Sequence, residues 1–102
     1  MATVGKSLPE MINKITNLIL ATRGSNRKKL QEQQAQLAKK LQKLIDKNVP
    51  QDTEEYKKLI SEIKKANGQI KAAIDDIKNV AETIETIGKV IGMLSKVAAM
   101  AV

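Results

Sequence analysis

The chain has 102 residues, which is the length of one domain, and 42% of them are hydrophobic, which is enough for an ordered fold. Its net charge at neutral pH is +7. It contains no Cys and no His, which excludes a disulfide framework, a Cys/His zinc site and a Ser-His or Cys-His nucleophile. Only 1% of the residues are aromatic, so a core must be built from Ile, Leu, Val, Met and Ala, which suits packing between helices.

The first predicted element is a helix over residues 8–22. Ser7 is placed to cap its N-terminus, with Pro9 in the first turn. Apolar residues then recur at spacings of three and four, which predicts one buried stripe of Leu8, Met11, Ile12, Ile15, Leu18 and Ile19. Gly24 can end this helix, and the alternative is a kink within one continuous helix.

The second predicted element is a helix over residues 26–47. Its apolar stripe is Leu30, Leu37, Leu41, Leu44 and Ile45. Pro50 then disfavours helical backbone at the residue before it, and Asp52 can cap a new helix start. The sequence therefore predicts the main turn at residues 48–52.

No comparable interruption follows, so residues 53–100 are predicted to form one helix about 70 Å long. Seven heptads carry no charged residue at either core position. Position a is Tyr56, Ile63, Ile70, Ile77, Ile84, Ile91 and Ala98. Position d is Leu59, Ala66, Ala73, Val80, Ile87, Leu94 and Ala101.

Together these elements predict an all-α protein, a single helical-hairpin domain over residues 1–102. The hairpin is antiparallel and coiled-coil-like, its first arm is broken near Gly24, and it assembles into a helical bundle or filament. Gln34 would lie opposite Asn67 as a polar layer. The predicted hairpin seam contains Ile15, Leu37, Ile63, Ile70, Ile77, Ile84 and Ile91.

The C-terminal segment is more apolar than a hairpin with one neighbouring helix can cover, which indicates contact with further copies. The predicted assembly interface combines small side chains with apolar ones: Gly88, Gly92, Ser95, Ala99, Val90, Val97 and Met100. Two other interpretations of the glycines are a fraying helix end and a membrane dimerisation motif.

Charge is concentrated in the middle of the chain. Residues 23–71 contain 13 Lys or Arg and 6 Asp or Glu, whereas the remaining residues contain 5 of each. A lysine line at seven-residue spacing and a cluster in the second helix are candidate anion-binding residues: Lys57, Lys64, Lys71, Lys78, Arg27, Lys28 and Lys29. The alternative is the solvated outer face of a coiled coil. Since no aromatic residue is interleaved for stacking, sequence-specific reading of bases is not expected.

The leading functional hypothesis is a non-enzymatic, self-assembling structural or interaction protein without cofactor, metal or small-molecule substrate. Its partners would be further copies of itself or another helical protein. Small exported hairpins such as the needle subunits of type III secretion resemble it in size and plan. The alternatives are a coat or nucleoid-type protein that binds nucleic acid non-specifically and an amphipathic protein that acts on anionic membranes.

Localisation stays open between the cytoplasm, a virion and export by a signal-independent route. The N-terminal residues lack the apolar core of a secretory signal peptide. The chain contains no run of about 18 apolar residues, so no membrane-spanning helix is predicted.

Overall fold

The computed structural model describes residues 4–45 and 53–100, and all regular structure in these two ranges is helical. The elements are α1 (Val4–Ala21), α2 (Gly24–Ile45), α3 (Glu54–Asp75), the short 3-10 helix η1 (Ile77–Asn79) and α4 (Val80–Ala99). The prediction of an all-α protein is confirmed. The predicted main turn at 48–52 lies outside the described residues.

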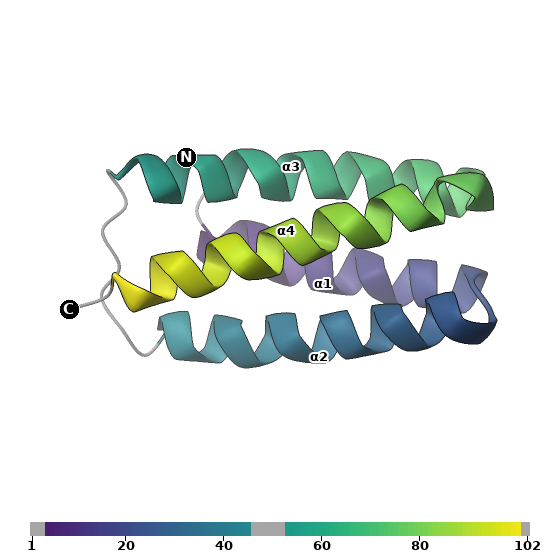
Figure 1. Ribbon diagram of the computed structural model, residues 1–102, viewed down its shortest axis with the longest axis horizontal. Coiled ribbons are helices and arrows are strands. Elements are labelled where there is room, and N and C mark those ends of the chain that lie inside the picture. Colours follow the sequence, from purple (N-terminus) through teal and green to yellow (C-terminus); the bar gives the residue numbers. More distant parts are fainter. Residues whose placement is uncertain (1–3, 46–52, 101–102) are drawn as a thin grey trace.

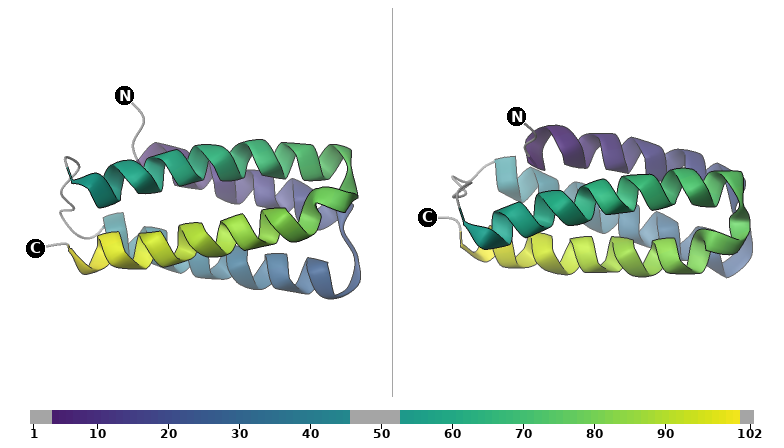
Figure 2. Two further views of the ribbon diagram at one scale, coloured as in Figure 1. Left: turned by 45° about the horizontal axis from the view of Figure 1, so that its top comes forward. Right: turned by 90° about the horizontal axis from the view of Figure 1, so that it is seen from above.

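The four α-helices lie side by side and alternate in direction (Figure 1). Helix α1 packs against α2 and α3, and helix α4 packs against the same two (Figure 2). Helices α2 and α3 are consecutive in the chain but lie diagonally opposite each other, so the neighbours α1 and α3 run parallel, as do α2 and α4. The resulting bundle measures 40 × 21 × 18 Å.

The predicted single helix over 53–100 is wrong, because the chain reverses direction at Asp76. This residue has extended backbone angles (φ −142°, ψ 107°). Its carboxylate oxygen Oδ1 accepts the backbone N–H of Lys78 at 3.1 Å, and its carbonyl accepts the N–H of Asn79 at 3.1 Å. The reversal lets α4 bury an apolar face against α2 and α3. In a rod about 70 Å long this face would stay in water, which is unfavourable.

The break also turns the apolar stripe of α4 relative to that of α3. Helix α3 buries its a and d positions, whereas α4 buries its d positions and the residues three places after them. The a positions of α4 are only half-buried, and Ile77 in η1 is 47% exposed. The assignment of Ile77 to the hairpin seam is therefore wrong.

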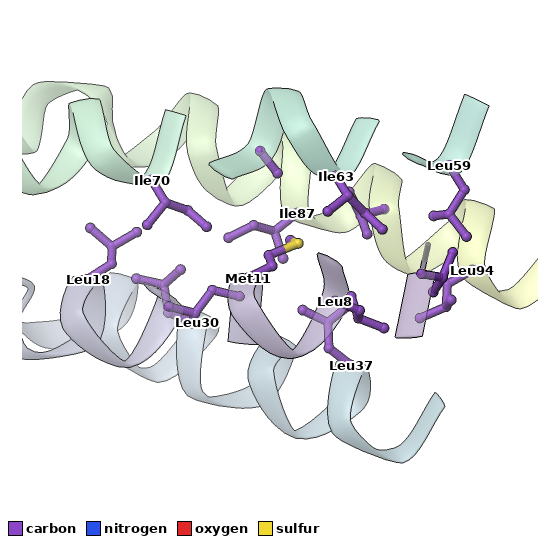
Figure 3. Close-up of a cluster of buried hydrophobic side chains, with 14 of the residues drawn as sticks. Leu8, Met11, Leu18, Leu30, Leu37, Leu59, Ile63, Ile70, Ile87 and Leu94 are labelled. Atoms are coloured by element: carbon purple, nitrogen blue, oxygen red, sulfur yellow. The ribbon is translucent and has the colours of Figure 1, made fainter. Parts of the chain in front are cut away.

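The core runs along the axis of the bundle and draws on all four helices (Figure 3). Ile15, Leu37, Ile63 and Ile70 of the predicted seam are fully buried, whereas Ile84 and Ile91 are half-buried. Leu37 and Ile63 were expected to face each other in a two-helix seam. They belong instead to the diagonal helices α2 and α3, and both side chains point into the core that all four helices form.

Helix α1 begins at Val4 rather than at residue 8, and Pro9 lies inside it. The backbone N–H of Val4 donates to the hydroxyl oxygen of Tyr56 at 2.9 Å, in a buried contact between α1 and α3. This contact satisfies one of the unpaired N–H groups at the helix start, which the Ser7 cap was expected to do. At the other end, α1 stops before Thr22 and Arg23, and Gly24 has a positive φ of 67°.

Two glutamines attach α2 to its neighbours. The side-chain nitrogen Nε2 of Gln34 donates to the carbonyl of Ile12 at 2.8 Å and to the hydroxyl of Thr16 at 2.7 Å. Gln33 Nε2 donates to the carbonyl of Ile84 at 2.9 Å. The predicted polar layer of Gln34 with Asn67 is therefore wrong, because Gln34 faces α1 and not the diagonal helix α3.

Candidate anion-binding surface

The outer side of α3 carries five exposed lysines, here called the α3 lysine face: Lys57, Lys58, Lys64, Lys65 and Lys71. The opposite side of the same helix supplies Leu59, Ile63 and Ile70 to the core, so the lysines point away from the bundle. Lys57 and Lys71 are 14 residues apart in the sequence. At about 1.5 Å per residue, the face therefore extends for about 21 Å along the helix.

The exposed carboxylates of α3 lie at its two ends, at Glu54, Glu55 and Asp75, and not between the lysines. The residues between the lysine pairs on the exposed side are Ser61 and Gly68, and Glu62 is half-buried on the flank. A shallow hollow that opens to solvent is lined by Glu54, Lys57, Lys58 and Ser61. Within residues 4–45 and 53–100 the one ion pair, at 3.3 Å, joins Lys14 to Glu10, so no carboxylate in these ranges forms an ion pair with the α3 lysine face.

Lys78 does not continue the lysine line, contrary to prediction. It lies in η1, beyond the end of α3 at Asp75. A seven-residue spacing keeps side chains in one line only while the helix is continuous. The line therefore ends at Lys71, and the exposed neighbours Lys58 and Lys65 give the face its second row.

Helix α2 carries a second basic surface. It contains six Lys or Arg and one Asp or Glu, and its Arg27, Lys28 and Lys29 are all exposed. Since α2 and α3 are diagonal in the bundle, the structure separates the two groups of predicted anion-binding residues onto different sides. They do not form one continuous track.

The predicted assembly interface on α4 is divided between surface and core. Val90 and Val97 are fully buried inside the bundle, so their assignment to an exposed interface is wrong. The cause is the turn of the apolar stripe after Asp76. Of the other predicted members, Gly88, Gly92 and Ala99 are exposed, and Ser95 and Met100 are half-buried.

The exposed glycines of the predicted interface, Gly88 and Gly92, have free space beside them. A Cβ atom added at Gly92 would meet no atom within 4 Å, and one added at Gly88 would meet only Gln33 Nε2, at 3.8 Å. Both positions thus tolerate a side chain within a single copy. The exposed residues of the predicted interface are small, and the large apolar residues nearest to them, such as Ile84 and Ile91 of α4 and Met100 after it, are half-buried.

The described residues contain no group of three or more Asp or Glu side chains placed to bind a metal ion. None of the described helices combines the length and the hydropathy needed to cross a bilayer. Comparison of the chain with protein-family models, curated proteins and solved structures found no match.

Sequence reasoning identified Leu20 as excess apolar surface of the first helix but missed the exposure of Ile74 and Ile77. Within the described ranges three large hydrophobic side chains are exposed: Leu20, Ile74 and Ile77. Heptad periodicity placed Ile77 in the seam. The signal that could have corrected this is the stretch Asp75-Asp76-Ile77-Lys78-Asn79, because Asp and Asn favour helix N-caps over helix interiors.

Proposed function

We propose that this protein is a non-enzymatic helical bundle that binds the phosphate backbone of nucleic acid through the α3 lysine face. The observation that carries the proposal is the arrangement of five exposed lysines on one side of a straight helix, with no ion pair to a described carboxylate. Such a surface gains affinity by releasing counterions from phosphates, which requires no base contacts.

The chemistry of the face favours a phosphate backbone over base edges. It contains no Arg, which would bind guanine in bidentate fashion, and no aromatic side chain on which a base could stack. Lysine acts as a flexible point charge toward phosphate. Binding is therefore expected to be independent of sequence.

The same face is poorly suited to an anionic membrane. Amphipathic helices at a bilayer surface insert large apolar side chains beside their lysines. The positions between the lysines of α3 are Ser61 and Gly68. Of the exposed large hydrophobic residues of the described chain, only Ile74 borders this face, one turn beyond Lys71. Nucleic acid is therefore the preferred anionic partner.

The test compares two triple variants that each lower the net charge from +7 to +4. One replaces Lys57, Lys64 and Lys71 of α3 by Gln, and the matched control replaces Lys28, Lys39 and Lys43 of α2, which are equally exposed. Affinity for a labelled duplex of random sequence is measured by fluorescence anisotropy between about 50 and 200 mM salt, the range in which phosphate contacts weaken steeply.

The α3 variant is expected to flatten the log–log dependence of affinity on salt by about 2.7, since each lost phosphate contact removes about 0.9. The α2 control should change this slope much less. Equal effects of both variants would mean that only net charge matters, and the α3 lysine face would then be an ordinary solvated surface. Absence of binding by the unaltered protein at low salt would exclude the proposal.

Self-association is a second candidate function. It is favoured by the exposed apolar residues at one end of the bundle and not by the stripe on α4 that the sequence predicted.

A further inference from the structure

One end of the bundle, here called the turn end, contains both the α1–α2 turn and the α3–η1–α4 turn (Figures 1 and 2). The three exposed large hydrophobic side chains of the described residues belong to these two turns. Leu20 is 71% exposed near the end of α1, Ile74 is 39% exposed near the end of α3, and Ile77 is 47% exposed in η1. Residues so far apart in the chain thus expose apolar area at the same end.

The two turns carry opposite charge. Residues 22–29 at the α1–α2 turn include four basic side chains and no acidic one: Arg23, Arg27, Lys28 and Lys29. Residues 75–82 at the α3–α4 turn include three acidic side chains and one lysine: Asp75, Asp76, Glu82 and Lys78. All eight are exposed. The turn end is therefore polarised, with a basic half, an acidic half and apolar residues in both turns.

Four of these charges have the unfavourable sign for the helix end beside them. The N-terminus of a helix attracts anions and its C-terminus attracts cations. Helix α2 nevertheless has Arg27, Lys28 and Lys29 close to its N-terminus at Gly24, and it has no acidic residue in its first turn. Helix α3 ends on Asp75 and has no basic residue in its last turn. Asp76 and Glu82 lie at the starts of η1 and α4, where negative charge is favourable. Folding of a single copy does not explain the placement of Arg27, Lys28, Lys29 and Asp75, because each of these charges opposes the nearest helix end.

We propose that the turn end binds a second copy of this chain by twofold, end-to-end pairing. The twofold axis lies perpendicular to the long axis of the bundle and runs between the two turns. This operation sets the basic turn of each copy against the acidic turn of the other, and a twofold interface requires such self-complementarity. It also covers Leu20, Ile74 and Ile77 and brings counter-charges to the ends of α2 and α3.

The size of the end face makes the pairing weak. The transverse extents of 21 and 18 Å give a face of about 400 Å², so a dimer would bury roughly 800 Å² in total. Stable complexes begin near 1,200 Å², and smaller interfaces belong to transient complexes. A monomer–dimer equilibrium that shifts with concentration and salt is therefore expected.

The test is a charge exchange followed by sedimentation equilibrium of the full chain. Arg27→Glu reverses one charge of the basic turn, so the net charge of residues 22–29 falls from +4 to +2. Asp75→Lys reverses one charge of the acidic turn, so the net charge of residues 75–82 goes from −2 to 0. Lys43→Glu at the far end of α2 is the matched control. In the proposed dimer residue 27 of each copy faces residue 75 of the other, so each substitution turns both of these 27–75 pairs into like-charge pairs. The dissociation constant of each reversed protein should rise about tenfold, with two pairs lost at roughly three- to fourfold each.

An equimolar mixture of the two reversed proteins should restore pairing as a heterodimer, because both of its 27–75 pairs are again between opposite charges. The reversed proteins should be at least as stable to urea as the original, since each substitution removes a charge of the wrong sign from a helix end. This separates lost pairing from lost folding. A third variant, Leu20→Gln with Ile77→Gln, should weaken pairing without charge change.

Three results would overturn the inference. The original protein could sediment as a monomer at all concentrations up to the millimolar range. Arg27→Glu could dimerise as well as Lys43→Glu. The mixture of reversed proteins could fail to pair more strongly than either alone. None of these measurements involves nucleic acid, so they are independent of the test of the α3 lysine face.

Discussion

At the scale of single residues, Gly24 is the most constrained backbone position of the described chain. It is the one residue there with a positive φ, 67°, and it links the end of α1 to the start of α2. A side chain at such an angle clashes with its own backbone. Space is not the constraint, because a Cβ atom at this position would meet no other atom within 4 Å.

We expect Gly24→Ala to lower the free energy of unfolding by about 1–2 kcal/mol, the usual cost of left-handed backbone in a residue with a Cβ atom. Gly92→Ala is the control, because Gly92 lies inside α4, is exposed and would meet no atom within 4 Å. It should raise stability by up to about 1 kcal/mol through helix propensity. Urea denaturation measures both, and equal effects of the two changes would contradict this account.

The sequence allowed burial to be predicted well in α3 and poorly in α4. Local spacing alone identifies the buried residues of α3, where Ile63 and Ile70 occupy the a position. In α4 the same spacing allowed several faces to be apolar, and Val90 and Val97 were placed outside. Which face is buried there depends on contacts with α2 and α3, which no local pattern encodes.

At the scale of elements, the chain reversal between α3 and α4 depends on a few polar contacts. Asp76 accepts the N–H of Lys78 through its side chain, as an N-cap residue does for the 3-10 helix that follows. Its own N–H donates to the carbonyl of Ala72 at 2.8 Å, which closes the end of α3. Apolar periodicity continues through this segment, so only the polar residues mark the turn.

Asp76→Ala is expected to destabilise the bundle by about 1 kcal/mol, the typical cost of losing an N-cap side chain. The control, Asp75→Ala, removes a neighbouring carboxylate at the C-terminus of α3 that makes no capping bond to η1. It should be neutral or slightly stabilising, because that helix end disfavours negative charge. Thermal unfolding followed by circular dichroism compares the two; a larger loss for Asp75→Ala would refute the capping role.

The break between α1 and α2 was predictable because Gly24 marks it in the sequence. The break near Gly24 was expected, and the structure has its non-helical residues at Thr22 and Arg23. The start of α1 was misplaced because its N-terminal contact comes from Tyr56, which is 52 residues away in sequence. A hydrogen bond between residues so far apart produces no recognisable pattern in the local sequence.

At the scale of the whole molecule, the same apolar pattern fits both a long rod and a short bundle. In a rod, α3 and α4 form one helix, so Glu55 and Lys96 would lie about 60 Å apart. In the bundle these two exposed residues lie near the same end, on adjacent antiparallel helices. The distance between them therefore distinguishes the two arrangements.

The measurement is electron–electron resonance between spin labels on cysteines introduced at residues 55 and 96, which is simple because the chain has no Cys. The expected separation is close to the 21 Å width of the bundle, extended by the label linkers. Labels at residues 55 and 75, both in α3, should give about 30 Å in either arrangement. A distance near 60 Å for the first pair would show that α3 and α4 are continuous in solution.

The diagonal placement of α2 and α3 has a consequence for the order of folding. Within the α1–α2 and α3–α4 hairpins, helices that follow one another in the chain pair across short turns, which costs little loop entropy. The parallel pairs α1/α3 and α2/α4 can form only when two hairpins dock. The rate-limiting step is therefore expected to be docking, and substitutions at parallel-pair contacts that form in its transition state should slow folding more than they speed unfolding.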